Sequence, residues 1–294
     1  MSGDLWQGYG LTQNPFQTSA LTEGGALDVG KVFVGRDKEI NKINSVIKNS
    51  SHSILILGGS VGVGKTSLVN HIKKYWKYSN SAKGLFSSRR EIETNIQNLT
   101  KKRFILEIIS SIINEIELVD PTLLRNPILR PIVSLISVIN TGGLRTEFGI
   151  NYGIGSIKTS NSEEYYSSGE IPDTALEAYL KKLIKIIKEK GVKDNAYDGV
   201  LVHVNNLDVI LSEQDGEKAL VRFFDEIRDL LTFDNIHYVF IGPKDMYKRV
   251  IGSRNRVSSI VSDSPILIDP LSKTQIIEAI YERIVKIEKY KILL

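Results

Sequence analysis

The chain has 294 residues, of which 41% are hydrophobic and 24% are charged, and these are ordinary values for a globular protein. It has no cysteine, which excludes disulfides and cysteine-based metal sites and fits a reducing compartment. The formal net charge of +4 permits contact with nucleic acid without requiring it.

A membrane role is not expected either. The longest apolar-leaning run, PIVSLISVIN, is too short for a bilayer, which needs ~20 residues. The first residues lack the basic flank and apolar stretch of a secretory signal. We therefore expect a cytoplasmic protein.

The first half of the chain predicts an irregular arm followed by alternating helices and strands. Residues 1–30 are rich in Gly, Thr, Ser and Asn and form the expected arm. Apolar residues then recur at helical spacing from Asp37 to about Asn49, and SILILGG at 53–59 has the character of a buried strand. A helix running to about Trp76, a weak strand at 84–88 and a helix over 104–118 complete this half.

The second half repeats the alternation after an interruption. Residues 141–172 carry many Gly and Ser and predict an inserted hairpin and loop. Helices are expected at 173–190, 216–231 and from Ser272, with strands at 200–204, 236–242 and 265–269. Nearly continuous apolar strands between helices predict an α/β fold, a parallel sheet covered on both faces. The expected core is 31–271, and 272–294 is a short C-terminal part.

A phosphate-binding loop lies between the first strand and its helix. The segment GSVGVGKT matches G-x-x-x-x-G-K-[ST] at every fixed position. Its glycines let backbone N–H groups point at phosphate oxygens, and the following helix adds its positive end. Lys65 is expected to reach the β- and γ-phosphates of ATP, and Thr66 to bind Mg²⁺. The expected nucleotide contacts in this loop are Gly59, Ser60, Val61, Gly62, Val63, Gly64, Lys65, Thr66 and Ser67.

The strand LVHV ends in amides where such folds place acids. Asn205 occupies the position of a metal-supporting Asp, and Asn206 that of the acid which orients the attacking water. A neutral amide takes no proton and is a poorer partner for a metal-bound water, so hydrolysis is expected to be weak. Asp208 leaves a second interpretation open, because it could support the metal through a water and keep hydrolysis working. His203 is interpreted as a core histidine.

The chain resembles the AAA+ and STAND ATPases, and among them the origin-recognition type replication initiators. The resemblance rests on VFVGRDKEI, the phosphate loop, LVHVNNLD, YVFIGP, the run NRVSSIVSDSPILIDPLS and IYERI. It implies that Val34, Gly35 and Arg36 lie beside the adenine. It also implies that IYERI belongs to a helical lid in which Arg283 senses the γ-phosphate.

The sequence departs from that family at several points. The second acidic motif is amidated, and the strand expected to end in a γ-phosphate sensor ends in Gly242-Pro243. Where the initiators have an arginine that acts on a neighbouring subunit, this chain has Ile260, with Arg254 and Arg256 as nearby substitutes. The sequence has one expected lid helix and lacks the winged-helix DNA-binding domain that the initiators carry next, so we expect either that it is the ATPase part of a longer design or that partners complete it.

Two basic clusters permit contact with nucleic acid or with a neighbouring subunit. One combines lysines and arginines between 73 and 103 with aromatic residues, although a solvated helix face is the stronger explanation. The other is Lys244, Lys248, Arg249, Arg254 and Arg256.

The leading hypothesis is an ATPase switch that assembles with itself or a partner protein in a DNA-related or defence process. A non-hydrolysing scaffold and a DNA loader are the alternatives. The inserted segment at 141–172 is expected to contact a partner.

Overall fold

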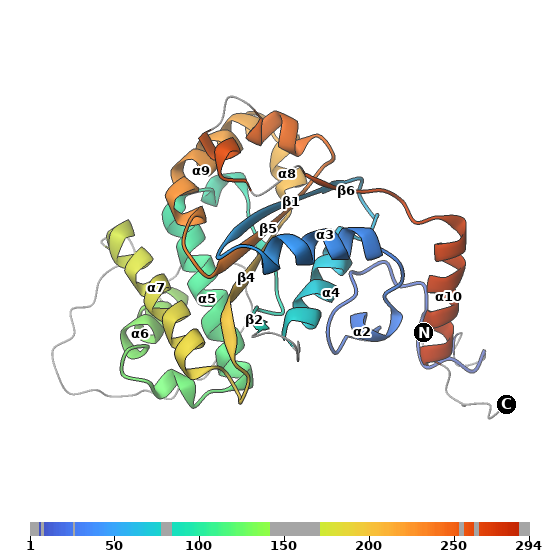
Figure 1. Cartoon of the computed structure of the whole chain (residues 1–294), viewed down its shortest axis with the longest axis horizontal. Helices are drawn as coiled ribbons and strands as arrows, with labels where there is room; N and C mark the ends of the chain where they lie inside the picture. The colour runs from blue at the N-terminus through green and yellow to red at the C-terminus, as the bar shows by residue number, and fades with distance from the viewer. Residues whose placement is uncertain are drawn as a thin grey trace.

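The protein folds as a parallel six-stranded sheet between two layers of helices (Figure 1). The computed structural model describes residues 6, 9–25, 27–77, 84–141, 171–252, 256–261 and 265–287. The strand order is β2-β4-β5-β1-β6, with the short β3 also paired to β4, and every pairing is parallel. The predicted fold class is therefore confirmed.

The strands are short apolar segments, apart from the longer β4. Their bounds are β1 Ser53–Gly59, β2 Gly84–Phe86, β3 Ile92–Glu93, β4 Tyr197–Asn205, β5 Ile236–Gly242 and β6 Ile266–Ile268. All seven residues of β1 and of β5 are buried. This burial on both faces explains why their sequences are continuously apolar rather than alternating.

Helices cover both faces of the sheet. Their bounds are α2 Val29–Val32, α3 Asp37–Lys48, α4 Lys65–Lys77, α5 Lys101–Val119, α6 Arg130–Thr141, α7 Asp173–Lys190, α8 Leu207–Ser212, α9 Gly216–Leu231 and α10 Lys273–Ile287. Short 3₁₀ turns lie at Ile96–Asn98, Leu123–Arg125 and Arg256–Ser259, and a π-helical turn at Tyr247–Ile251.

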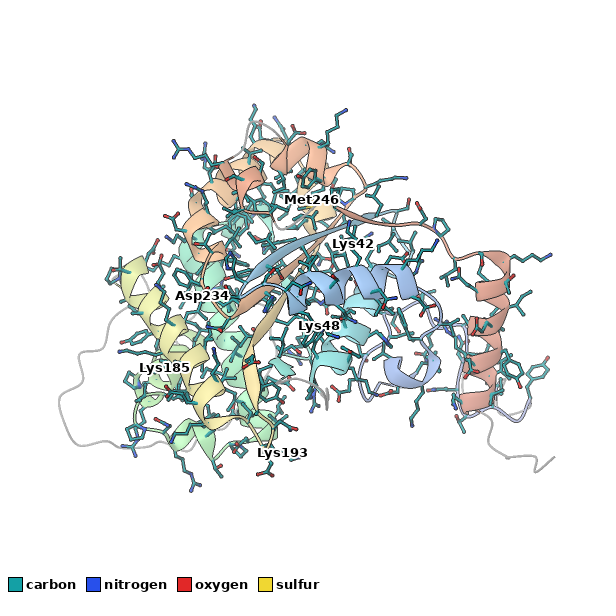
Figure 2. All side chains as sticks on the ribbon, in the orientation of Figure 1. Lys42, Lys48, Lys185, Lys193, Asp234 and Met246 are labelled. Carbon is teal, nitrogen blue, oxygen red and sulfur yellow. The ribbon has the colours of Figure 1, made fainter. Side chains whose placement is uncertain are left out.

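The two faces of the sheet bury separate apolar clusters. The larger cluster lies between the sheet and α5, α7 and α9, and the smaller one between the sheet and α3 and α4. Side chains fill these spaces in Figure 2, where Met246 is buried while Lys48 on α3 and Lys185 on α7 are exposed. No helix among the described residues is long and apolar enough to cross a bilayer.

Most predicted elements are present, whereas the helices α2, α6 and α8 and the strand β3 were not predicted. Helix α6 covers the run that sequence reasoning considered only as a membrane span, and β3 was too short to recognise. The predicted insert begins at Thr141, the last residue of α6, and ends beyond Ile171, where description resumes. Its remaining residues, 142–170, lie outside the described part of the chain.

The N-terminal arm is tied to α4 by specific bonds. The Leu21 N–H donates to the Ser67 hydroxyl (3.0 Å), and the Asn70 amide donates to the Leu21 carbonyl (2.9 Å). Asp28 accepts from Lys74 at 2.7 Å. Arm residues form a third apolar cluster with α2, and Ile284 of α10 packs against it. Most described residues of the arm lie outside helices and strands, and the arm packs against the helix that begins in the phosphate loop.

Candidate nucleotide site

The phosphate loop lies between the end of β1 and the start of α4. Gly62 and Gly64 have φ angles of 81° and 92°, a left-handed region in which a β-carbon is strained. Gly59 is required for another reason, because a β-carbon there would lie 2.7 Å from the Ile268 carbonyl oxygen on β6. The loop is open to solvent at Val61, which is 86% exposed. This geometry fits an anion held by backbone N–H groups at a helix start.

Lys65 is held inside the loop that it closes. Its ammonium group donates to the carbonyl oxygens of Gly59 (2.8 Å) and Ser60 (2.9 Å). Burial lowers the pKa of Lys65, and the negative charge of Asp208 acts in the opposite direction. Asp208 is therefore close enough to influence the phosphate-binding lysine, as expected for an acid of this site.

The amide of Asn205 lies beside Thr66, the residue predicted to bind the metal. Leu201 packs in the cluster that includes α4, and alternation along the strand turns His203 and Asn205 to that same face. The Asn205 Nδ2 donates to Thr66 Oγ1 at 3.3 Å. An amide therefore occupies the place beside Thr66 where the sequence led us to expect it. Whether this slows hydrolysis stays a prediction.

Asn206 and Asp208 are separated from Asn205 by a sharp change of backbone direction. Asn206 has a left-handed backbone, with φ of 63°, and immediately precedes α8. Asp208 is in the first turn of α8 and is partly buried. The structure thus brings Asp208 toward Lys65 by a turn at Asn206.

Glu91 is a site residue that sequence reasoning missed. The Asn205 Nδ2 also donates to Glu91 Oε1, at 3.4 Å. Glu91 directly precedes β3, whose Ile92 and Glu93 pair with Val204 and Asn205 at the end of β4. No local motif marks this residue, because only the pairing of β3 with β4 brings it to the site.

The segment predicted to lie beside the adenine also braces the phosphate loop. Arg36 is 8% exposed and donates to the Val63 carbonyl at 2.9 Å and to Glu39 at 3.2 Å. Gly35 precedes it with φ of 71°, and a β-carbon there would lie 2.7 Å from the Gln275 side chain on α10. Among Val34, Gly35 and Arg36, Arg36 therefore contacts the loop and Gly35 approaches α10. Their contact with a base stays a prediction.

Arg283 and Arg256, the two arginines predicted to act on the nucleotide from a distance, have different surroundings. The Arg283 guanidinium donates to the Pro15 carbonyl in the arm at 3.3 Å. Arg256 is exposed at the start of a 3₁₀ turn, where the predicted contact with a neighbouring subunit has room. Arg254 lies outside the described residues. No contact places Arg283 or Arg256 against the phosphate loop, so their roles in nucleotide sensing stay predictions.

His203 is buried as predicted, but it is not a satisfied core histidine. It is 3% exposed, and neither ring nitrogen has a hydrogen-bond partner in the described structure. Burial, with help from the charge of Lys73, holds the pKa of His203 well below its usual range. The ring is therefore neutral.

Acids in the fold neutralise much of the first basic cluster. Lys77 pairs with Glu23 at 3.2 Å, and Arg89 pairs with Glu115 at 3.1 Å. In the second cluster Arg249 pairs with Glu217 at 2.8 Å. Trp76 is buried, so it offers no surface for stacking. Some members of both clusters are thus paired with acids of the same chain. Within the described ranges, no group of three or more His, Asp or Glu side chains could hold a metal.

The chain is similar to several known proteins. It matches an uncharacterized ATP-binding protein of Methanocaldococcus jannaschii with 31% identity over 101 residues. The matched segment covers 31% of this chain and 25% of that protein. The chain is also similar to the Orc1 protein of Aeropyrum pernix, solved in complex with DNA (TM-score 0.43, 14% identity), over 87% of this chain and 50% of that one. A Walker-type ATPase of Pyrococcus abyssi has a TM-score of 0.43 and 12% identity, over 90% of this chain and 60% of that one.

A family model covers far more of the sequence than the Methanocaldococcus match does. The model of the KAP family P-loop domain matches residues 36–235, about two thirds of the chain. The matched region runs from Arg36 through the phosphate loop and LVHVNNLD to the start of β5. The expected relationship to the P-loop ATPases is confirmed, and the chain belongs to the KAP family of P-loop domains.

Proposed function

We propose that the chain binds ATP with Mg²⁺ at the Gly59–Ser67 loop and hydrolyses it slowly, as a switch for assembly. One observation carries the proposal: an intact phosphate loop adjoins an amide, because the Asn205 Nδ2 lies 3.3 Å from the Thr66 hydroxyl. The loop binds phosphate without help from Asn205. Hydrolysis also needs support for the metal and for the attacking water, and a neutral amide gives less of both.

The chain's own groups divide the work in the following way. The backbone N–H groups of the loop and Lys65 hold the phosphates, and the Thr66 hydroxyl with nearby carboxylate oxygens suits Mg²⁺, which prefers oxygen ligands. When bound, the metal would neutralise phosphate charge. Lys65 leaves the Gly59 and Ser60 carbonyls to reach the phosphates, while Asp208 keeps its ammonium group charged.

Nucleotide-dependent assembly is the proposed output. Arg256 is exposed, as a group reaching a neighbouring subunit's nucleotide must be. The resemblance to replication initiators supports a DNA-related process, and the resemblance to STAND ATPases a defence process. We assign the ATPase core to 31–271, the arm to 1–30 and the start of a lid to 272–294. The chain spans a quarter of the Methanocaldococcus protein's length, so its whole activity is part of the proposal.

Paired measurements on three chains test the proposal: the native protein, Lys65→Ala and Asn205→Asp. ATP affinity is measured first, followed by single-turnover hydrolysis. We expect tight binding that is lost in Lys65→Ala, slow native turnover and faster turnover in Asn205→Asp. Native turnover that Asn205→Asp leaves unchanged would mean that Asp208 supplies the function of the strand-end acid.

A non-hydrolysing scaffold is the second candidate, and the amide beside Thr66 favours it equally. It predicts ATP binding that depends on Lys65, with no phosphate release in the native chain. A DNA loader would additionally bind DNA with an affinity that falls steeply as salt rises. Fluorescence anisotropy of labelled DNA at two salt concentrations separates that reading from the other two.

A further inference from the structure

The starting observation is a carboxylate placed against the amide of Asn205. Glu91 Oε1 lies 3.4 Å from the Asn205 Nδ2, and the same nitrogen lies 3.3 Å from the Thr66 hydroxyl. Glu91 is partly buried, at the end of the sheet where β3 joins β4. The three side chains therefore form a line from the predicted metal-binding hydroxyl to a negative charge.

The carboxylate determines which way the amide faces. An ionised carboxylate only accepts hydrogen bonds, whereas an asparagine side chain has one accepting and one donating end. Glu91 therefore requires the nitrogen of Asn205 on its own side. The amide oxygen, the only atom of that group able to face a metal-bound water, is then free of Glu91.

A buried lysine also lies near Glu91. Lys73 is 6% exposed and donates to the Arg90 carbonyl at 3.4 Å. Burial lowers the pKa of Lys73 to about 8, while the charges of Glu91 and Glu115 act to raise it. Glu91 thus has an amide donor at 3.4 Å and a buried cation near it.

We propose that Glu91 and Asn205 act together as the acid of this site, with Glu91 as a positioning residue. By accepting from the amide nitrogen, the carboxylate polarises the amide and makes its oxygen a stronger acceptor. Hydrogen-bonded partners of metal-site groups act in this way elsewhere, and their loss typically costs about 10- to 100-fold in metal affinity. The pair thus gives the metal more support than a lone amide would, but less than a carboxylate at position 205. This inference rests on the proposed function and adds a residue to its site.

The test follows Mg²⁺ and not turnover. The affinity of the full chain for a fluorescent ATP analogue is measured in EDTA and over a Mg²⁺ titration. The chains compared are native, Glu91→Gln, Asn205→Asp and the double variant, in which amide and acid have exchanged places. Glu93→Gln is the matched control, since it removes the same charge from an exposed position two residues away.

We expect Glu91→Gln to raise the half-maximal Mg²⁺ concentration about tenfold without changing affinity in EDTA. The exchanged pair should return that concentration to within about threefold of native, because it again has one acid and one amide. Asn205→Asp alone sets two acids side by side, so adding Glu91→Gln to it should help, not harm.

Three results would overturn the pairing. They are an unchanged Mg²⁺ midpoint in Glu91→Gln, an equal shift in Glu93→Gln, and a Glu91→Gln effect of the same size with Asn or Asp at 205. Thermal unfolding of each variant identifies misfolded protein, and the exchanged pair still decides the matter if one single variant is unstable. Failure of the proposed function would appear differently, as analogue binding in EDTA that Lys65→Ala does not weaken.

Discussion

Replacing Asp28 with alanine should destabilise the whole nucleotide domain, although the residue lies in the arm. The Asp28 carboxylate accepts from the N–H groups of Gly24 (2.7 Å) and Gly30 (2.9 Å) and from Lys74 (2.7 Å). The Gly30 bond caps α2, and the Lys74 bond fastens the arm to α4. One residue thus orders the arm and attaches it.

The magnitude follows from those bonds. Loss of a helix cap costs ~0.5–2 kcal/mol, and a hydrogen bond to a charged group contributes ~1.5–3 kcal/mol. Because the side chain of Asp28 is 16% exposed, water replaces part of what is lost. We therefore expect Asp28→Ala to lower the free energy of unfolding by about 2–4 kcal/mol.

Urea unfolding followed by tryptophan fluorescence measures this loss. The midpoint should fall while the slope stays constant, as expected when native stability alone changes. Asp229→Ala is the control, because Asp229 is exposed on α9 and should change stability by less than about 0.5 kcal/mol. An Asp28→Ala loss no larger than that of the control would refute the idea that the arm is part of the fold.

The same carboxylate gives a pH dependence. Burial acts to raise the pKa of Asp28, but the bonds from Lys74, Gly24 and Gly30 outweigh it and hold the pKa below the usual value. The contribution of Asp28 is therefore full above its unfolded pKa of about 3.9 and is lost as the pH falls below it. The difference between native and Asp28→Ala stability should shrink in that acid window.

Three further changes test the core and the loop. Burial, with help from His52, lowers the pKa of His237 to about 4, whereas the unfolded value is about 6.5. The contribution of His237 to the free energy of unfolding should therefore be complete above pH 6.5 and fall by about 3 kcal/mol as the pH is lowered to 4. A stability profile of the native protein that is flat over that range would contradict this. Trp76→Phe leaves the buried Asn44 oxygen, 2.9 Å from the indole nitrogen, without its donor and should cost about 1–3 kcal/mol in urea unfolding; no loss would mean that water replaces the indole. Gly59→Ala should lower the melting temperature more than Gly62→Ala, since only the first β-carbon meets backbone; the reverse order would show that the strained φ of Gly62 matters more.

Local patterns predicted much of the fold correctly. The bounds of β1, α7, α9 and β5 agree with the sequence prediction, because each is a continuous apolar or helically periodic segment with clear ends. Helix α6 was missed because its run is apolar on most sides and lacks a clear start signal. Strand β3 has two residues, which is too short for any period to be visible.

The site was predictable only where its residues are close in sequence. The phosphate loop is one continuous motif, and Asn205 was found because it ends a recognisable strand. Glu91 is 114 positions from Asn205, and Leu21 is 46 from Ser67. Such contacts depend on strand pairing and on the path of the arm, which composition and periodicity do not determine.

The bond between Arg283 and Pro15 has a consequence for biosynthesis. These residues are 268 positions apart, and both the arm and α10 pack against α2 or α4. A chain emerges from the ribosome at ≈ 5–20 residues per second, so α10 is synthesised at least about 13 seconds after the arm. During that interval the arm's leucines lack the cover of α10, so a chaperone that binds short apolar segments would find them accessible.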